Sequence, residues 1–252
     1  MIAIVRHGER EDDSTNRKRR SNIGYDPSLS ELGEEQARLT GRYILEKYLY
    51  KENYHTQNNL KIISSPFLRT LQTAENIAQE VNCQRIYVWD PICEELKEDI
   101  FDFFPLPHIN FYVHNMEFIS EHFLSGANTE VIRMEDQEEI LMPYNYPERK
   151  ENKNSRLPHV RAQIAFDYLI RTQFDDETYH ECSNPEVAQS PNHKDANIVL
   201  LVTHAFALLP FVKYFTEQNT YSDRGYCSLS VAERVASNSW KLIEPLSSQH
   251  LS

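Results

Sequence analysis

Short apolar runs alternate along the chain with longer stretches in which apolar residues recur every three or four positions. The runs have the length and composition of buried strands and cover residues 2–5, 61–65, 85–89 and 197–203. The periodic stretches predict helices over residues 30–49, 67–81 and 205–215. Strands that alternate with helices pair mainly in parallel and are covered by helices on both faces. The predicted fold class is therefore α/β, a three-layer α/β/α sandwich around a mostly parallel sheet.

The length of the chain, 252 residues, is compatible with a single α/β domain, and we predict one domain over residues 1–252. Two segments interrupt the alternation and are interpreted as insertions at the functional edge of the sheet, at about 101–155 and 177–194. The first is acidic and aromatic, with Phe101, Phe103, Phe104, Phe111, Tyr112 and Phe118. A small core beneath the insertion is the favoured interpretation of these aromatics, ahead of a substrate pocket or lid.

Composition and charge exclude several classes of function. Hydrophobic residues make up 40% of the chain, and no apolar run approaches the roughly 20 residues that span a bilayer. The net charge of -12 opposes general binding to nucleic acid or to an anionic membrane. The basic run Arg17–Arg20 is interpreted as a solvated loop, ahead of a nuclear import or polyanion-binding signal. A phosphorylated substrate must therefore be met by a local positive pocket.

The sequence also carries an expectation about its compartment. The first residues run directly into an apolar strand, with no basic segment and no long apolar segment typical of a secretion signal. The cysteines Cys83, Cys93, Cys182 and Cys227 are scattered, so that neither a zinc site nor a disulfide framework is predicted. We expect a cytoplasmic protein in a reducing environment.

The most informative short segment is Arg6-His7-Gly8-Glu9-Arg10, which directly follows the first predicted strand. A histidine beside a fork-shaped cation is suited to attack a phosphoryl group and to hold its oxygens. A single histidine in this position is more often structural, and a single arginine more often forms a surface ion pair. The interpretation therefore depends on what else the chain contains.

Three segments together resemble the histidine phosphatase superfamily, also called the phosphoglycerate mutase-like superfamily. They are Arg6-His7-Gly8, the stretch DPSLSELGEEQA at 26–37, and the stretch SSPFLRTLQTA at 64–74. Shorter similarities follow at Ile92-Cys93-Glu94, at Val202-Thr203-His204-Ala205, and near the end at 240–243 and 250–251. The resemblance touches both ends of the chain and leaves the two insertions without counterparts.

The resemblance implies a phosphoglycerate mutase-like fold and a role for each matching residue. His7 is implied to be the nucleophile, and Glu94 the acid and base of the reaction. Arg6, Arg69 and His204 are implied to contact the phosphate, with His204 also part of the catalytic set. Such donors can neutralise a transferring phosphoryl group without a metal, so neither a metal nor another cofactor is expected.

Two assignments stay open at this point. Arg10 stands where mutases carry serine and resembles the branch with tyrosine-phosphatase-like and ecdysteroid-phosphate phosphatases, which implies a further phosphate-binding cation. The alternative for Arg10 is a local salt bridge. The acid and base is expected at Glu94, with the adjacent Glu95 as the alternative. The histidine acid phosphatase branch is disfavoured because His204 is followed by Ala205, where that branch has aspartate.

The functional hypothesis is a metal-independent phosphomonoester hydrolase that acts through a phosphohistidine on His7. Its partner would be a phosphorylated substrate, either a small molecule or a phosphoprotein. One alternative is phosphoryl transfer of the phosphoglycerate mutase type, which uses the same nucleophile. Another is a non-catalytic binding or structural protein that uses residues 101–155 as an interface. The sequence leaves the substrate and the oligomeric state open.

Overall fold

The computed structural model describes residues 1–13, 26–49, 60–95, 116, 119, 129–134, 158–174, 198–216, 224–236 and 239–252. Several sequence predictions lie outside these residues. They are the interpretation of the basic run 17–20, that of Cys182, the aromatic cluster of the first insertion, and the whole second insertion, 177–194.

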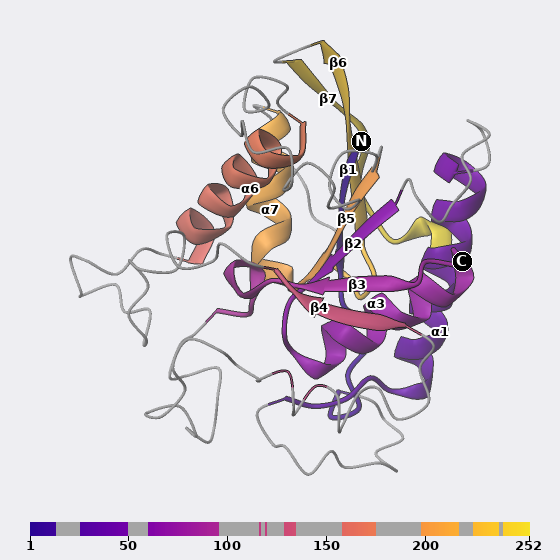
Figure 1. Cartoon of the computed structure of the whole chain (residues 1–252). Helices are drawn as coiled ribbons and strands as arrows, with labels where there is room; N and C mark the ends of the chain where they lie inside the picture. Colours follow the sequence, from indigo (N-terminus) through magenta and orange to yellow (C-terminus); the bar gives the residue numbers. More distant parts are fainter. Residues whose placement is uncertain are drawn as a thin grey trace.

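The described residues form a sheet of seven strands in the order β4-β3-β2-β5-β1-β6-β7 (Figure 1). The strands are β1 Ile2–Arg6, β2 Leu60–Ser64, β3 Arg85–Val88, β4 Glu130–Arg133, β5 Ile198–Thr203, β6 Leu229–Ala236 and β7 Ser239–Ser247. The five strands from β4 to β1 pair in parallel, whereas β6 and β7 are antiparallel to their neighbours. This confirms the predicted α/β class with a mostly parallel sheet.

Helices cover the sheet on both faces. They are α1 Glu31–Ile44, which continues as the π-helical turn η1 Leu45–Leu49, then α3 Leu68–Glu80, α6 Pro158–Phe174 and α7 Ala205–Phe215. Figure 1 shows α1 and α3 on one side of the sheet and α6 and α7 on the other. The helix predicted over 30–49 is thus present, and its N-cap is Ser30, whose hydroxyl accepts from the amide of Gly33 at 3.0 Å.

The alternation of side chains along β1 shows how the two faces share the core. Ala3 and Val5 pack into the cluster with α1 and α3, whereas Ile2 and Ile4 pack into the cluster with α6 and α7. Successive residues of a strand point to opposite faces, so a continuous apolar run is what a strand buried on both faces requires. The three-layer arrangement follows directly from this pattern.

The sequence does not predict four of the α-helices and strands, namely β4, α6, β6 and β7. Part of the first predicted insertion forms β4, which pairs in parallel with β3 at the edge of the sheet. Helix α6 packs against α7. The hairpin β6–β7 forms the edge of the sheet opposite β4. Among the described residues, none of the helices combines the length and the apolar character needed to cross a membrane.

Candidate active site

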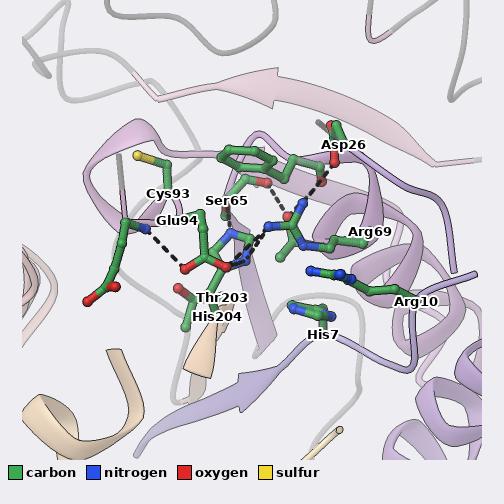
Figure 2. A network of polar contacts seen from close by, with 12 residues as sticks. His7, Arg10, Asp26, Ser65, Arg69, Cys93, Glu94, Thr203 and His204 are labelled. Atoms are coloured by element: carbon green, nitrogen blue, oxygen red, sulfur yellow. Dashed lines mark hydrogen bonds and ion pairs between the residues drawn. The ribbon is translucent and has the colours of Figure 1, made fainter. Parts of the chain in front are cut away.

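The predicted site residues gather where adjacent parallel strands end. His7 follows β1, Ser65 follows β2 and His204 follows β5, and these three strands lie side by side in the sheet. The pairing continues past the strands, because the amide of His7 donates to the carbonyl of Thr203 at 2.9 Å. The carboxyl ends of parallel strands meet at one edge, where α/β proteins place their ligands. Figure 2 shows the resulting cluster.

His7 is buried and electrostatically biased toward its neutral form. Its Nδ1 lies 2.8 Å from the carbonyl oxygen of Gly8, so that Nδ1 carries the proton and Nε2 keeps its lone pair. Burial, followed by the charge of Arg69, the ring of His204 and the charge of Arg6, holds the pKa of His7 well below its ordinary value of 6.5. At neutral pH, His7 therefore presents an unprotonated nitrogen, which is the form that acts as a nucleophile.

The loop that carries His7 is held by an unusually close approach to helix α1. A β-carbon added at Gly8 would lie 2.4 Å from the carbonyl oxygen of Gly33, and one added at Gly33 would lie 2.2 Å from that of Glu9. The amide of Gly8 also donates to the hydroxyl of Thr73 on α3 at 3.0 Å. Any side chain at either glycine would force the loop and the helix apart.

Arg69 extends from α3 into the middle of the cluster and is almost wholly buried, with 2% of the side chain exposed. One Nη donates to Asp26 at 3.0 Å, and the other lies 3.2 Å from both Glu94 and His204 Nδ1. Its Nε is buried without a hydrogen-bond partner among the described residues. A buried donor without an acceptor is rare and indicates a place for a ligand or water.

Arg6 approaches from the end of β1 and shows the same feature. Its Nη1 donates to the carbonyl of Arg224, and its guanidinium carbon lies 4.2 Å from the ring centre of Tyr226. Its Nε, like that of Arg69, is buried with no partner in the described part of the chain. Two buried arginine donors beside an unprotonated histidine form a site suited to an anion.

Glu94, which is partly buried, pairs with the fully buried His204. His204 Nε2 lies 2.8 Å from the hydroxyl of Ser65, and Nδ1 lies 3.2 Å from Glu94 Oε2. Burial lowers the pKa of His204 to about 4, which outweighs the opposing effect of Glu94. Burial alone would raise the pKa of Glu94, but His204 and then Arg69 outweigh it and hold that pKa well below its ordinary value. The pair thus has an ionised carboxylate and a neutral imidazole at pH 7.

The two open assignments can now be described geometrically. Glu94 lies in the cluster, whereas Glu95 contributes its backbone amide, which donates to Glu94 Oε1 at 3.0 Å. Arg10 forms a two-point ion pair with Asp12 at 2.9 and 2.8 Å and lies 3.3 Å from Asp13. Burial and, to a smaller extent, the charge of Arg10 lower the pKa of Arg6, so Arg10 forms the local salt bridge and also lies near a site arginine. Figure 2 draws Arg10 in the same close view as His7 and Arg69.

The described residues at the site include some that sequence reasoning had not singled out. The ring of Tyr226 lies 5.7 Å from that of His7, and its hydroxyl donates to Asp13. Asp26 is the first residue of the stretch 26–37 and had no predicted role. Its carboxylate accepts hydrogen bonds from Arg69 at 3.0 Å and from the amide of Leu68 at 2.7 Å. No local pattern distinguishes Tyr226, because it lies in a loop far along the chain from Arg6.

The ligand atoms of His7, Glu94 and His204 lie within 4.8 Å of one another, a spacing that could hold a metal ion. The arginines beside them disfavour a cation and favour an anion. The prediction that the site works without a metal stays a prediction.

Comparison with known proteins agrees with the resemblance. Residues 2–98 match the family model described as histidine phosphatase superfamily (branch 1). The match spans the amino-terminal part of this chain and supports the resemblance seen in the sequence. A search of curated proteins finds no significant match.

Solved structures show the same fold over nearly the whole chain. The ecdysone phosphate phosphatase of Bombyx mori, in complex with tungstate, is 16% identical, with a TM-score of 0.56 over 97% of this chain and 92% of that chain. A protein named mycobacterial hydrolase 2 is 16% identical, with a TM-score of 0.50 over 98% of this chain and 91% of that chain. The description of the matched family and the name of the first structure both contain the word phosphatase, in agreement with the predicted enzyme class.

Proposed function

We propose that this chain is a metal-independent phosphomonoester hydrolase that forms a phosphohistidine on Nε2 of His7. The observation that carries the proposal is the protonation state of His7. Its Nδ1 is engaged by the carbonyl of Gly8, and its pKa is lowered by burial and by two arginines. The same arginines that lower this pKa provide donors for the oxygens of a phosphoryl group.

The proposed binding mode uses the donors that lack partners. The Nε atoms of Arg6 and Arg69 would donate to phosphoryl oxygens, with His204 and Arg10 at the border of the same space. Charge on a transferring phosphoryl group is spread over its three equatorial oxygens, so several fixed donors stabilise it better than one. Arg10 would contribute by redirecting its guanidinium from the pair with Asp12 and Asp13.

The proposed reaction has two steps. In the first, the Nε2 lone pair attacks phosphorus in line, the bond to the ester oxygen breaks, and Glu94 gives the leaving oxygen a proton. In the second, water attacks the phosphohistidine, Glu94 accepts a proton from that water, and His7 leaves as neutral imidazole with inorganic phosphate as the product. Glu94 must be protonated for the first step, and a bound phosphate dianion beside it raises the pKa of Glu94 in that direction.

The proposed substrate is a phosphate monoester on a small molecule or a protein. The site contains two histidines, two or three arginines and one carboxylate, and these groups address only the phosphoryl group. We further propose that the chain acts as one catalytic domain over residues 1–252, because strands β1, β2 and β5 of a single sheet, with helix α3 packed against it, position most of the site residues. A cytoplasmic location is also proposed, because the buried thiols of Cys83 and Cys227 suit a reducing compartment.

The test is phosphate release from para-nitrophenyl phosphate between pH 4 and 8, with and without a metal chelator. Wild type is compared with His7→Ala, and acid-labile phosphohistidine is trapped in the wild type by rapid quenching. The proposal expects activity that survives the chelator and is lost with His7→Ala. A folded wild type that releases no phosphate and accumulates no phosphohistidine would contradict it.

A further inference from the structure

Glu94 lies in an irregular segment, outside any helix or strand. Strand β3 ends at Val88, and the short 3-10 turn η3 spans Asp90–Ile92. Glu94 follows this turn. The backbone carbonyls here have no ladder partners, so the position of the Glu94 carboxylate depends on what else binds the segment.

Four successive carbonyls of this segment accept hydrogen bonds from two buried side chains. Arg161 Nη1 donates to the carbonyls of Pro91 and Cys93, both at 2.8 Å, and Arg161 Nη2 donates to that of Glu94 at 2.9 Å. The remaining carbonyl, of Ile92, accepts from the hydroxyl of Thr203 at 2.7 Å. Figure 2 shows Thr203 beneath the segment, directly before His204.

Arg161 itself is fixed by its surroundings. It lies on helix α6, is 1% exposed, and its guanidinium carbon lies 5.1 Å from the ring centre of Phe206 on α7. A planar fork of five donors can reach several carbonyls at once and keeps its charge when buried. A lysine has a single nitrogen and cannot span the same acceptors.

We propose that Arg161 is a positioning residue for the acid and base of the reaction. By clamping the carbonyls on both sides of Cys93, it holds the Glu94 carboxylate 3.2 Å from both Arg69 and His204. A shift of about 1 Å in such a group is enough to slow proton transfer strongly. In the described part of the chain, the hydrogen bonds of Arg161 go to the segment 91–94 and not to His7, His204 or Arg69, so in this proposal it acts through Glu94. This inference rests on the proposed role of Glu94.

The test compares two substrates whose leaving groups differ in how strongly they depend on a proton from Glu94. Arg161→Lys, Glu94→Gln and the double variant are compared by kcat/KM on para-nitrophenyl phosphate and on phenyl phosphate, whose leaving group is more basic. Acid catalysis contributes about 10²-fold or more, so both single variants should lose roughly tenfold more on phenyl phosphate than on para-nitrophenyl phosphate. The double variant should be no slower than Glu94→Gln alone, within about twofold.

The second step supplies an independent readout. If Glu94 is displaced, water attack on phosphohistidine slows, and Arg161→Lys should show a burst of para-nitrophenol together with accumulated phosphohistidine. Arg171→Lys is the matched control, since Arg171 lies exposed on the same helix and donates to the carbonyl of Asp167 at 3.3 Å. It should behave as wild type on both substrates.

Three outcomes separate the possibilities. An equal loss on both substrates for Arg161→Lys, multiplying with that of Glu94→Gln, would reduce Arg161 to a structural role and overturn the inference. If Glu94→Gln itself shows no leaving-group dependence, the proposed acid and base role fails as well. If Arg161→Lys does not fold, Thr203→Val decides: removal of the second anchor should produce the same substrate dependence, and its absence rejects the positioning model.

Discussion

Two buried clusters of charged and polar side chains differ in how completely they are hydrogen-bonded. At β7, Glu244 accepts from Tyr43 at 2.7 Å, from Lys47 at 2.6 Å and from Tyr48, and among the described residues none of these four side chains has a buried atom without a partner. In the candidate active site, Arg6 and Arg69 each keep a buried Nε without one. A complete cluster stabilises the fold, whereas an incomplete one is prepared for a ligand.

The electrostatic consequences of the two clusters differ in the same way. Burial opposes ionisation of Glu244, but its bonds to Lys47, Tyr48 and Tyr43 outweigh that effect and lower its pKa. In the site, burial and the neighbouring arginine keep both histidines neutral. The site therefore keeps uncharged histidines beside cationic arginines, as the proposed phosphoryl transfer requires, and such an arrangement reduces folding stability.

The largest expected difference concerns activity. Arg69→Lys keeps the charge but loses the fork that joins Asp26, Glu94 and the space for the phosphate. Loss of a preorganised donor reduces kcat/KM by about 10²- to 10³-fold, and we expect that range. Glu244→Gln, measured in the same assay on para-nitrophenyl phosphate, should stay within about twofold of wild type. A comparable loss in both variants would remove the distinction between the clusters.

The next effect concerns stability and has the opposite pattern. Glu244→Gln removes the charge that Lys47 and two tyrosine hydroxyls engage, and we expect a loss of about 2 kcal/mol in the free energy of unfolding in urea. Glu233→Gln on the adjacent strand β6, where the side chain is half-buried, is the matched control and should change it by less than about 0.5 kcal/mol. Equal urea midpoints of unfolding for the two variants would show that the cluster around Glu244 does not contribute to stability.

A smaller effect should separate the clusters by pH. The pKa of His204 is about 4 in the folded state, against 6.5 for an ordinary histidine, so the unfolded chain binds more protons between these values. The unfolding free energy should therefore fall by on the order of 1–3 kcal/mol as pH drops from 6.5 to 4. The depressed pKa of Glu244 acts only at the acidic end of this window and below it, because that carboxylate loses its contribution as pH falls under about 4.5.

The variants His204→Asn and Glu244→Gln make this pH prediction specific. Urea unfolding of His204→Asn should show a shallower dependence between pH 6.5 and 5, since one histidine with a lowered pKa is gone. Glu244→Gln should keep the slope of the wild type in the same window. If His204→Asn retains the full slope, the neutral state of His204 is not what links the site to stability.

The smallest expected effect concerns the border of the site. Tyr226→Phe keeps the ring beside Arg6 and removes the hydroxyl that donates to Asp13. Loss of one partly exposed hydrogen bond is worth about 1 kcal/mol or less, so KM should change by no more than about fivefold at constant kcat. A large drop in kcat would instead place the hydroxyl of Tyr226 in the reaction itself.

Much of the fold was predictable because the core strands have a local signature. The helix predicted over 205–215 coincides with α7, and the run 197–203 contains β5. The edge elements were not predictable in this way. Strand β4 is four residues long, and one face of β7 is exposed, so neither shows the continuous apolar run of a buried strand. Their identity depends on the neighbour that each one pairs with.

The features of the candidate site likewise divide into those that are local in the sequence and those that depend on tertiary contacts. The amino-acid sequence alone determined the order of β1, β2, β3 and β5 and of the helices α1, α3 and α7, the motifs around His7 and Arg69, and the chemical class to which they point. Only the tertiary structure decided that Glu94 and not Glu95 joins His204, that Tyr226 faces Arg6, and that Arg161 clamps the segment of Glu94. Periodicity and motifs are local properties, whereas these contacts depend on strand order and register, which bring together residues that lie far apart in the chain.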